Sequence, residues 1–466
     1  MFSVFIDQVS PRIHYILEEL FTRRLHVELQ IHTDYGAYLN DKSVYKIEYV
    51  GVKNTESHGF VIIRSDFMLE NLVDPLFEPE TSSFQLGEHA QSVLNHLFSV
   101  CSPSAKESDR VKRFLEEPFP CLFSNDSDLG FDIFAMAFYF LSRYEEYQDF
   151  KADQYGRFGF YNSLESKWDY DQAPHVDIAF FHFLDTLGAA ALIPQSQTIA
   201  SFDIDIAFRF KGRSWKRQLA SAIRFPKTLF ARFAVLFGGN DPFDPEKTIF
   251  PFLQKHKVDS RVFWLCSKKV KGVNRQVKRS FLPFKETIKK CETTSPIGLH
   301  PSFSLHPKET WSEEKTWLES SLNKVITDSR QHFVHLVFPQ TYQELIQMGI
   351  QHDWSMGYAE RFGFRAGTAF DFNWFDLSTN KPTGLVVHPF CIMDVTAKNY
   401  LKLTPEAAID VGRPLQEMVF LFGGNFTFIA HNESLSESAG WNGWTKVFDS
   451  WANNPLEKQR YKTLKN

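Results

Sequence analysis

The chain has 466 residues, of which 43% are hydrophobic, and a formal net charge of −5. This length exceeds one ordinary hydrophobic core and predicts two domains, while the negative charge argues against a general nucleic-acid binder. The five cysteines are scattered and form no Cys-x-x-Cys pair, which argues against a disulfide framework or a structural zinc site and favours a reducing compartment.

The amino terminus shows none of the features of a secretory signal. It lacks a basic segment, a sustained apolar run and a cleavage site of small residues. No apolar run elsewhere approaches the ~20 residues that cross a bilayer. We therefore expect a cytoplasmic protein without a transmembrane segment.

Residues 1–195 predict a small α/β domain. Ser10 caps a helix and Pro11 suits its first turn, and apolar residues follow at helical spacing. A buried aromatic helix is expected near residues 131–147. Segments rich in β-branched and aromatic residues predict strands at 26–31, 45–50 and 60–63. The sequence indicates no function for this domain.

The turn-rich residues 192–197 separate this domain from a second one, residues 196–466. Short apolar segments then alternate with longer polar segments of helical length. This alternation is typical of a parallel α/β sheet or barrel. Its strands are predicted at 198–202, 262–265, 297–299, 333–338, 363–365, 385–387 and 426–430.

Residues 211–237 mix basic with large apolar side chains and are interrupted by Pro226. Such a segment is typical of a solvated surface helix. The alternative is an amphipathic surface that contacts anionic lipid or a lipid-linked substrate. Because basic helices are common on soluble proteins, we expect the solvated helix and keep peripheral membrane contact as the alternative.

Asp203 and Asp205 are the first candidate site residues, in the sequence Ser-Phe-Asp-Ile-Asp after a short apolar run. Residues i and i+2 of a strand share one face, so both carboxylates project together at the strand end. Two adjacent anions are unfavourable unless a cation or proton lies between them. A metal ion is expected there, and the alternative is a strand-end pair that caps the next helix or faces water.

Three histidines, His300, His332 and His431, lie beside other predicted strands. A parallel α/β fold gathers the carboxyl ends of its strands at one face and builds its site there. Each histidine alone would more often be structural. One aspartate with two neutral imidazoles, however, leaves coordination positions open for water and substrate, as a hydrolytic metal requires.

Four motifs stand in one order along the second domain: Ser201–Asp205, Gly298–Ser302, Gly363–Thr368 and His431–Ser434. In this order they resemble the motifs of NodB-type polysaccharide deacetylases, and most closely a bacterial branch with an extra N-terminal domain. The resemblance implies a distorted (β/α) barrel and a divalent metal. Zinc suits the predicted ligands, and Co²⁺, Ni²⁺ or Mn²⁺ can replace it.

The resemblance also implies a role for each matching residue. Asp203 matches the general base that takes a proton from the attacking water, and Asp205 and His300 match metal ligands. Arg365 matches the arginine that orients the catalytic aspartate through an ion pair. His431 matches the general acid that protonates the leaving amine.

Two departures from the family pattern affect these roles. No histidine stands one helical turn after His300, and the next one, His306, is six residues away. Either His306 reaches the metal from a loop or His332 supplies the ligand, and we favour His332 because its surroundings match the branch. The usual adjacent aspartates are separated by one residue, which leaves the division of roles between Asp203 and Asp205 open.

The sequence therefore predicts a metal-dependent hydrolase that removes N-acetyl groups from a glycan or a lipid-linked sugar. Two alternatives stay open. One is a non-catalytic carbohydrate-binding or scaffold protein on the same barrel, and the other is a related hydrolase that cleaves a different amide or an ester.

Overall fold

The computed structural model describes residues 1–87, 91, 117–168, 172–269, 272–304 and 308–453. Its architecture is α/β, with a four-stranded parallel sheet near the amino terminus and a nine-stranded mixed sheet in the second half. The predicted fold class is confirmed at this level. No helix in the described part of the chain is long and apolar enough to cross a membrane.

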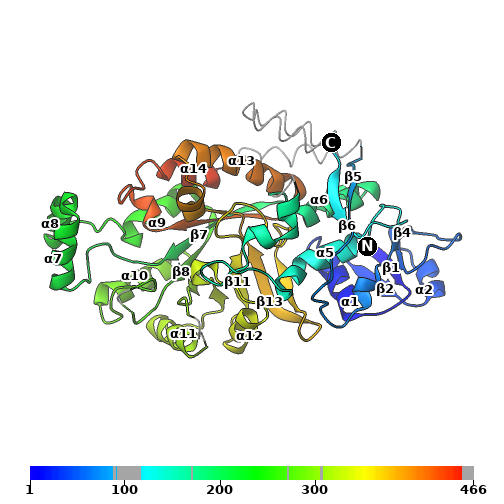
Figure 1. Ribbon diagram of the computed structural model, residues 1–466, viewed down its shortest axis with the longest axis horizontal. Helices are drawn as coiled ribbons and strands as arrows, with labels where there is room; N and C mark the ends of the chain where they lie inside the picture. Colours follow the sequence, from blue (N-terminus) through cyan, green and yellow to red (C-terminus); the bar gives the residue numbers. More distant parts are fainter. Residues whose placement is uncertain (88–90, 92–116, 169–171, 270–271, 305–307, 454–466) are drawn as a thin grey trace.

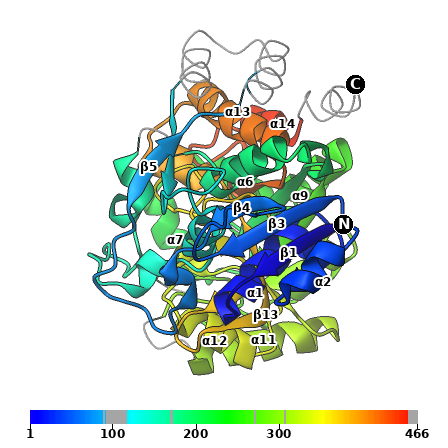
Figure 2. The same ribbon diagram turned by 90° about the vertical axis from the view of Figure 1, so that its right-hand side faces the viewer.

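The N-terminal sheet has the order β2-β1-β3-β4, and all its neighbouring strands are parallel. Figure 2 shows β1, β3 and β4 in front of the rest of the molecule. The sequence predicted three of these strands, β2, β3 and β4, and missed the buried strand β1. The bounds are β1 (Phe2–Ile6), β2 (Leu29–His32), β3 (Tyr45–Val50) and β4 (Phe60–Ile63).

The helices of this part form largely as their sequence predicts. The side chain of Ser10 accepts a hydrogen bond from the amide of Ile13 and so caps α1 (Pro11–Leu17). A π-helical turn, Glu18–Arg23, continues α1. The predicted aromatic helix is shorter than expected and is buried on every side. The remaining bounds are α2 (Tyr35–Asn40), β5 (Thr81–Phe84), β6 (Phe119–Leu122), α5 (Ile133–Leu141) and α6 (His175–Thr186).

The large sheet has the order β12-β13-β11-β10-β9-β8-β7-β15-β14 and is parallel except at the β12–β13 pair. The sheet is curled. Because its two edge strands, β12 and β14, do not pair with each other, it forms an open half-barrel and not a closed barrel. The bounds are β7 (Gln197–Ile204), β8 (Asp259–Trp264), β9 (Ile297–Leu299), β10 (Asp328–Ser329), β11 (His352–Met356), β12 (Phe372–Asp376), β13 (Lys381–Pro389), β14 (Ile392–Met393) and β15 (Asn425–His431).

Helices flank this sheet, with α13 and α14 above it and α10, α11 and α12 below it in Figure 1. Two further helices, α7 and α8, stand apart from it at the opposite end from the N-terminal sheet. The bounds are α7 (Trp215–Arg224), α8 (Leu229–Leu236), α9 (Pro245–His256), α10 (Leu282–Glu292), α11 (Lys308–Leu322), α12 (Gln340–Gln347), α13 (Pro405–Phe422) and α14 (Thr445–Ala452).

Two predicted strands are wrong. Residues 333–338 contain the end of a 3₁₀ turn, His332–Val334, and then loop, because Phe333 and Val334 adopt positive φ angles of 63° and 54° that no strand accommodates. Residues 363–365 are a loop as well. Most apolar residues of both segments are buried under other parts of the chain. Their hydrophobicity therefore indicates burial and not strand geometry.

We call the residues before β7 the N-terminal part. It shares one hydrophobic core with the half-barrel, and this core joins β1, α1 and α5 to β12 and β13. Within it, the rings of Tyr15 and Phe375 lie 5.0 Å apart. The Tyr15 hydroxyl also donates a hydrogen bond of 2.6 Å to the carbonyl of Asn373. The division of the chain into domains at residues 195 and 196 stays a prediction.

Candidate metal centre

The structure brings five of the predicted residues to one cavity of about 120 Å³. Because neighbouring strands are parallel, their carboxyl ends meet at this edge of the sheet. β7 contributes its end and the residue after it, β9 and β10 each contribute a following histidine, and β15 ends in one. The five are Asp203, Asp205, His300, His332 and His431. His306 lies outside the described residues.

Asp205, His300 and His332 form a group that can bind a metal ion. Their potential ligand atoms all lie within 4.8 Å of one another. Nε2 of His300 is 3.2 Å from Oδ1 of Asp205, and Nε2 of His332 is 3.4 Å from Oδ2. Oδ1 is buried yet accepts no hydrogen bond from any described residue. A buried carboxylate oxygen without a donor fits a cation, and the Asp/His/His set is one that zinc and similar ions prefer.

Both imidazoles are held by their other nitrogen. Nδ1 of His300 lies 2.6 Å from the carbonyl oxygen of Arg330, and Nδ1 of His332 lies 3.1 Å from Oδ1 of Asn274. These acceptors place the proton of each neutral ring on Nδ1. The lone pair of each Nε2 is then directed at Asp205. This tautomer, with the proton on Nδ1, is the one that a metal ligand bound through Nε2 needs.

The charges of the group favour a cation among these side chains. Burial opposes ionisation of Asp205, but the neighbouring imidazoles hold the pKa of its carboxyl well below the ordinary value. Burial also opposes protonation of His300, yet the carboxylates of Asp203 and Asp205 raise its pKa. Burial lowers the pKa of His332 and so keeps that ring neutral.

Asp203 is paired with Arg330, a residue that the sequence analysis did not select. Oδ1 of Asp203 lies 3.3 Å from Nη1 of Arg330, and both side chains are buried. The guanidinium is itself fixed: it donates to the carbonyl of Trp354 at 2.9 Å and to the hydroxyl of Ser201 at 2.9 Å. It also lies 4.6 Å from the ring centre of Phe263. Arg330 therefore holds Asp203 in one orientation at the cavity.

The expected ion pair between Arg365 and Asp203 is not what the structure shows. Arg365 instead forms a bidentate pair with Glu146 of the N-terminal part, in which Nε donates to Oε1 at 2.8 Å and Nη2 donates to Oε2. The loop that carries Arg365 packs against the N-terminal part, whereas Arg330 follows β10 and points into the interior of the curled sheet. The expected ion pair is therefore corrected: Arg330, and not Arg365, pairs with Asp203. The roles of these residues in any reaction stay predictions.

His431 is paired with Asp394, which was also missed. Nδ1 of His431 lies 2.8 Å from Oδ1 of Asp394, and its backbone amide donates to Oδ2 at 2.7 Å. Burial alone would lower the pKa of this histidine, but the Asp394 carboxylate and its hydrogen bond raise the pKa well above the ordinary 6.5. The ring is therefore protonated at neutral pH and can donate a proton.

The N-terminal part also reaches the cavity. Arg157 is one of the lining residues, and it donates hydrogen bonds to the carbonyl of Phe333 at 2.7 Å and to the hydroxyl of Tyr400 at 3.2 Å. Asp153 accepts from its Nε at 2.8 Å and fixes the guanidinium. Arg157 was not among the predicted site residues, because its contacts join segments far apart in the chain.

Comparisons with known proteins give one family and several solved structures. The family of unknown function DUF7033 matches residues 2–191, and no curated protein matches the chain. A putative polysaccharide deacetylase from Mycobacterium smegmatis is 13% identical with a TM-score of 0.36, over 58% of this chain and 91% of that chain.

Two further solved structures are similar to this chain. A polysaccharide deacetylase from Bacillus cereus is 9% identical with a TM-score of 0.28, over 57% of this chain and 89% of that one. A mutant of a CE4 family pseudoenzyme with restored enzymatic activity is 10% identical with a TM-score of 0.25, over 55% of this chain and 63% of that one.

Proposed function

We propose that the protein is a metal-dependent hydrolase that removes N-acetyl groups from a glycan or sugar. One observation carries the proposal: a group that can bind a metal ion shares a cavity with two further polar pairs. Asp205, His300 and His332 form the group, and the pairs are Asp203 with Arg330 and His431 with Asp394.

A divalent ion held by Asp205, His300 and His332 would supply Lewis-acid polarisation of the acetyl carbonyl and lower the pKa of a water molecule. Zn²⁺ suits this ligand set, and Co²⁺, Ni²⁺ and Mn²⁺ are the other candidates.

Asp203 and His431 divide the proton transfers in this proposal. Asp203, oriented by Arg330, accepts the proton of the attacking water as the bond from oxygen to the acetyl carbon forms. His431, kept protonated by Asp394, donates its proton to the nitrogen as the C–N bond breaks. The products are acetate and a free amine on the sugar.

The test combines metal analysis with acetate release from a panel of N-acetylated oligosaccharides. We expect near-stoichiometric metal in the wild type, loss of metal and activity in Asp205→Ala and His300→Ala, and retention of metal without turnover in Asp203→Asn. His14→Ala, which removes an exposed histidine, is the matched control and should resemble the wild type.

Two results would contradict the proposal. The first is a wild type that binds no zinc after incubation with excess ion, which would favour a carbohydrate-binding protein. The second is acetate release that Asp203→Asn, Asp205→Ala and His300→Ala all leave unchanged.

A further inference from the structure

Helices α7 and α8 form a hairpin, residues 211–237, that projects from the end of the half-barrel (Figure 1). A 3₁₀ turn, Pro226–Thr228, joins the two helices. No residue of α7 is buried, and only Arg232 and Val235 of α8 are. The hairpin therefore contributes almost nothing to the core of the protein.

Large apolar side chains face solvent along the hairpin. Trp215, Leu219 and Ile223 recur every four residues of α7 and are 56–75% exposed. In α8, Phe230 is 87% exposed, as is Phe237 just beyond its end. Residues at these spacings share one helix face, so the hairpin carries apolar stripes that the described part of the chain leaves uncovered. Patches of this kind mark interaction surfaces.

The charge of the hairpin is opposite to that of the whole protein. Residues 211–237 contain seven lysines and arginines and no aspartate or glutamate, in a chain whose net charge is −5. Among the residues that the structure describes, only Lys211 of these seven forms an ion pair, at 3.8 Å to Asp244. Arg232 is buried and donates hydrogen bonds within the hairpin. The other five cations are at least partly exposed and are available to an anionic partner.

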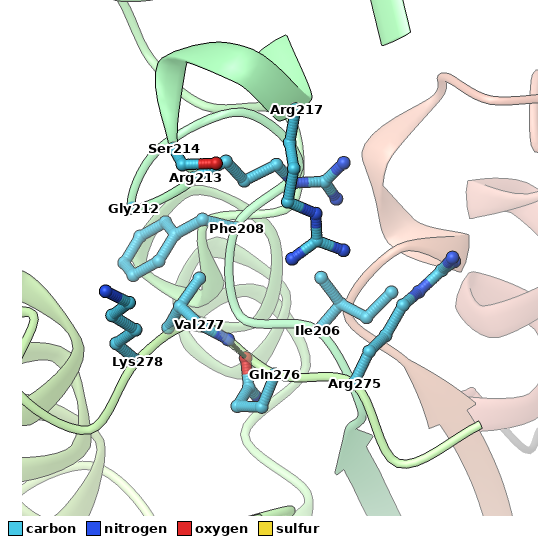
Figure 3. Close-up of a pocket in the computed structure, with 10 residues that line it drawn as sticks. All are labelled: Ile206, Phe208, Gly212, Arg213, Ser214, Arg217, Arg275, Gln276, Val277 and Lys278. Carbon is cyan, nitrogen blue, oxygen red and sulfur yellow. Dashed lines mark hydrogen bonds between the residues drawn. The ribbon is translucent and has the colours of Figure 1, made fainter. Parts of the chain in front are cut away.

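A pocket of about 60 Å³ at the base of the hairpin concentrates this charge. Figure 3 shows Arg213 and Arg217 from the hairpin and Arg275 from the facing loop with their guanidinium groups on the same side of the pocket. None of the described residues that line it is acidic. Burial and the charges of Arg275 and Arg217 lower the pKa of Arg213 to about 10. Clustered guanidinium groups of this kind match phosphate oxygens.

We propose that this hairpin is an interfacial anchor that docks on an anionic phospholipid surface. Its tryptophan and phenylalanine side chains enter the boundary between headgroups and acyl chains, and its cations contact headgroup phosphates. A second copy of the chain fits less well, because two such hairpins would bring fourteen positive charges together with no acidic residue of their own.

Docking would also orient the candidate site. The loop that leads to the hairpin begins at Ile206, directly after Asp205, so the hairpin emerges from the edge of the sheet where the metal ligands lie. The anchor does not depend on hydrolase activity, and Asp205→Ala should bind vesicles like the wild type.

The test is co-sedimentation of the full chain with vesicles of phosphatidylcholine, with and without about 30% phosphatidylglycerol. We expect binding to the anionic vesicles that weakens as salt rises. Phe230→Ser with Phe237→Ser should lower the partition coefficient at least about tenfold. Lys216→Gln, Arg224→Gln and Lys227→Gln together should lower it to a similar extent.

Matched controls separate the hairpin from general effects. Leu76→Ser removes a side chain that is 86% exposed elsewhere. Lys42→Gln, Lys381→Gln and Lys402→Gln remove three exposed charges outside the hairpin. Both controls should bind like the wild type. No binding to anionic vesicles, equal losses in the controls, or a wild-type dimer that the two serine substitutions dissociate would each overturn the proposal.

Discussion

Arg365 offers the sharpest test, because the sequence and the structure give it different roles. Replacing Arg365 with methionine keeps most of the side-chain volume and removes the charge from its pair with Glu146. Each side chain in that pair is 2% exposed. Breaking a buried pair by removing one partner costs about 3–5 kcal/mol. Glu146 keeps a hydrogen bond of 2.8 Å from Arg143, so we expect the lower end, about 3 kcal/mol.

Replacing the acid of this pair should lower the free energy of unfolding more than replacing Arg365. Glu146→Gln removes the negative charge that Arg143 and Arg365 share, and Arg365 then keeps only neutral acceptors, such as the carbonyl of Gly357 at 3.3 Å. A buried guanidinium without a carboxylate predicts the upper end of the range, about 5 kcal/mol. Urea denaturation gives both values, with acetate release and metal content measured on the folded fraction of each variant.

The contrast with Arg330 decides the role. In Arg365→Met the turnover of each folded molecule should stay within about threefold of the wild type, since the hydrogen bonds of Arg365 go to Glu146 and Gly357, neither of which lines the cavity. Arg330→Met should lose turnover, because Asp203 then has no cation to orient it. Wild-type stability combined with lost turnover in Arg365→Met would refute this reasoning and return the residue to the role that the family resemblance implied.

The remaining predictions concern the other pairs. Asp203→Asn should retain metal by elemental analysis and lose about 10²–10⁴-fold in turnover. Asp394→Asn should lower turnover more than metal content, because His431 would no longer be held protonated, and equal losses of both would contradict this. Burial raises the pKa of Glu165 to about 8 and lowers that of His175, its partner at 3.1 Å, to about 3, so both are neutral at pH 7. Unfolding releases the Glu165 proton between its ordinary pKa, 4.5, and about 8, so the contribution of Glu165 to stability falls as pH rises through that window, by about 1.4 kcal/mol per pH unit. The lowered pKa of His175 acts in the opposite direction below pH 6.5 and is common to the wild type and the variant. Glu165→Gln should remove this part of the pH dependence, and a wild-type-minus-variant difference in unfolding free energy that does not change from pH 5 to 8 would contradict it.

Strands with a continuous apolar pattern could be predicted from the sequence, and polar ones could not. β9 has the predicted bounds, and β15 differs from its prediction by one residue at each end. β11 was missed because its sequence contains Asp353 and Ser355. Both are buried there because Asp353 accepts hydrogen bonds from Ser355 at 2.9 Å and from Tyr342 at 3.0 Å. Such compensation depends on contacts that no local pattern reveals.

The candidate site divides in a similar way. Placing polar residues at strand ends predicted that Asp203, Asp205, His300 and His431 would lie close together, and the structure brings them to one cavity. Their roles stay predictions. Arg330 could not be found by this reasoning, because it reaches Asp203 from a strand three positions away, across the interior of a curled sheet. The order of strands and the degree of curl are not encoded in the spacing of residues.

The N-terminal part supports the candidate site and does more than cover a sheet edge. Phe333, next to the potential ligand His332, has a positive φ of 63°, which costs a residue with a side chain about 1–2 kcal/mol. Two contacts from the N-terminal part offset that cost: Arg157 donates to its carbonyl at 2.7 Å, and the ring of Tyr155 stacks on its ring at 5.0 Å. The position of His332 therefore depends on residues that precede the half-barrel in sequence, and the two parts of the chain form the candidate site together.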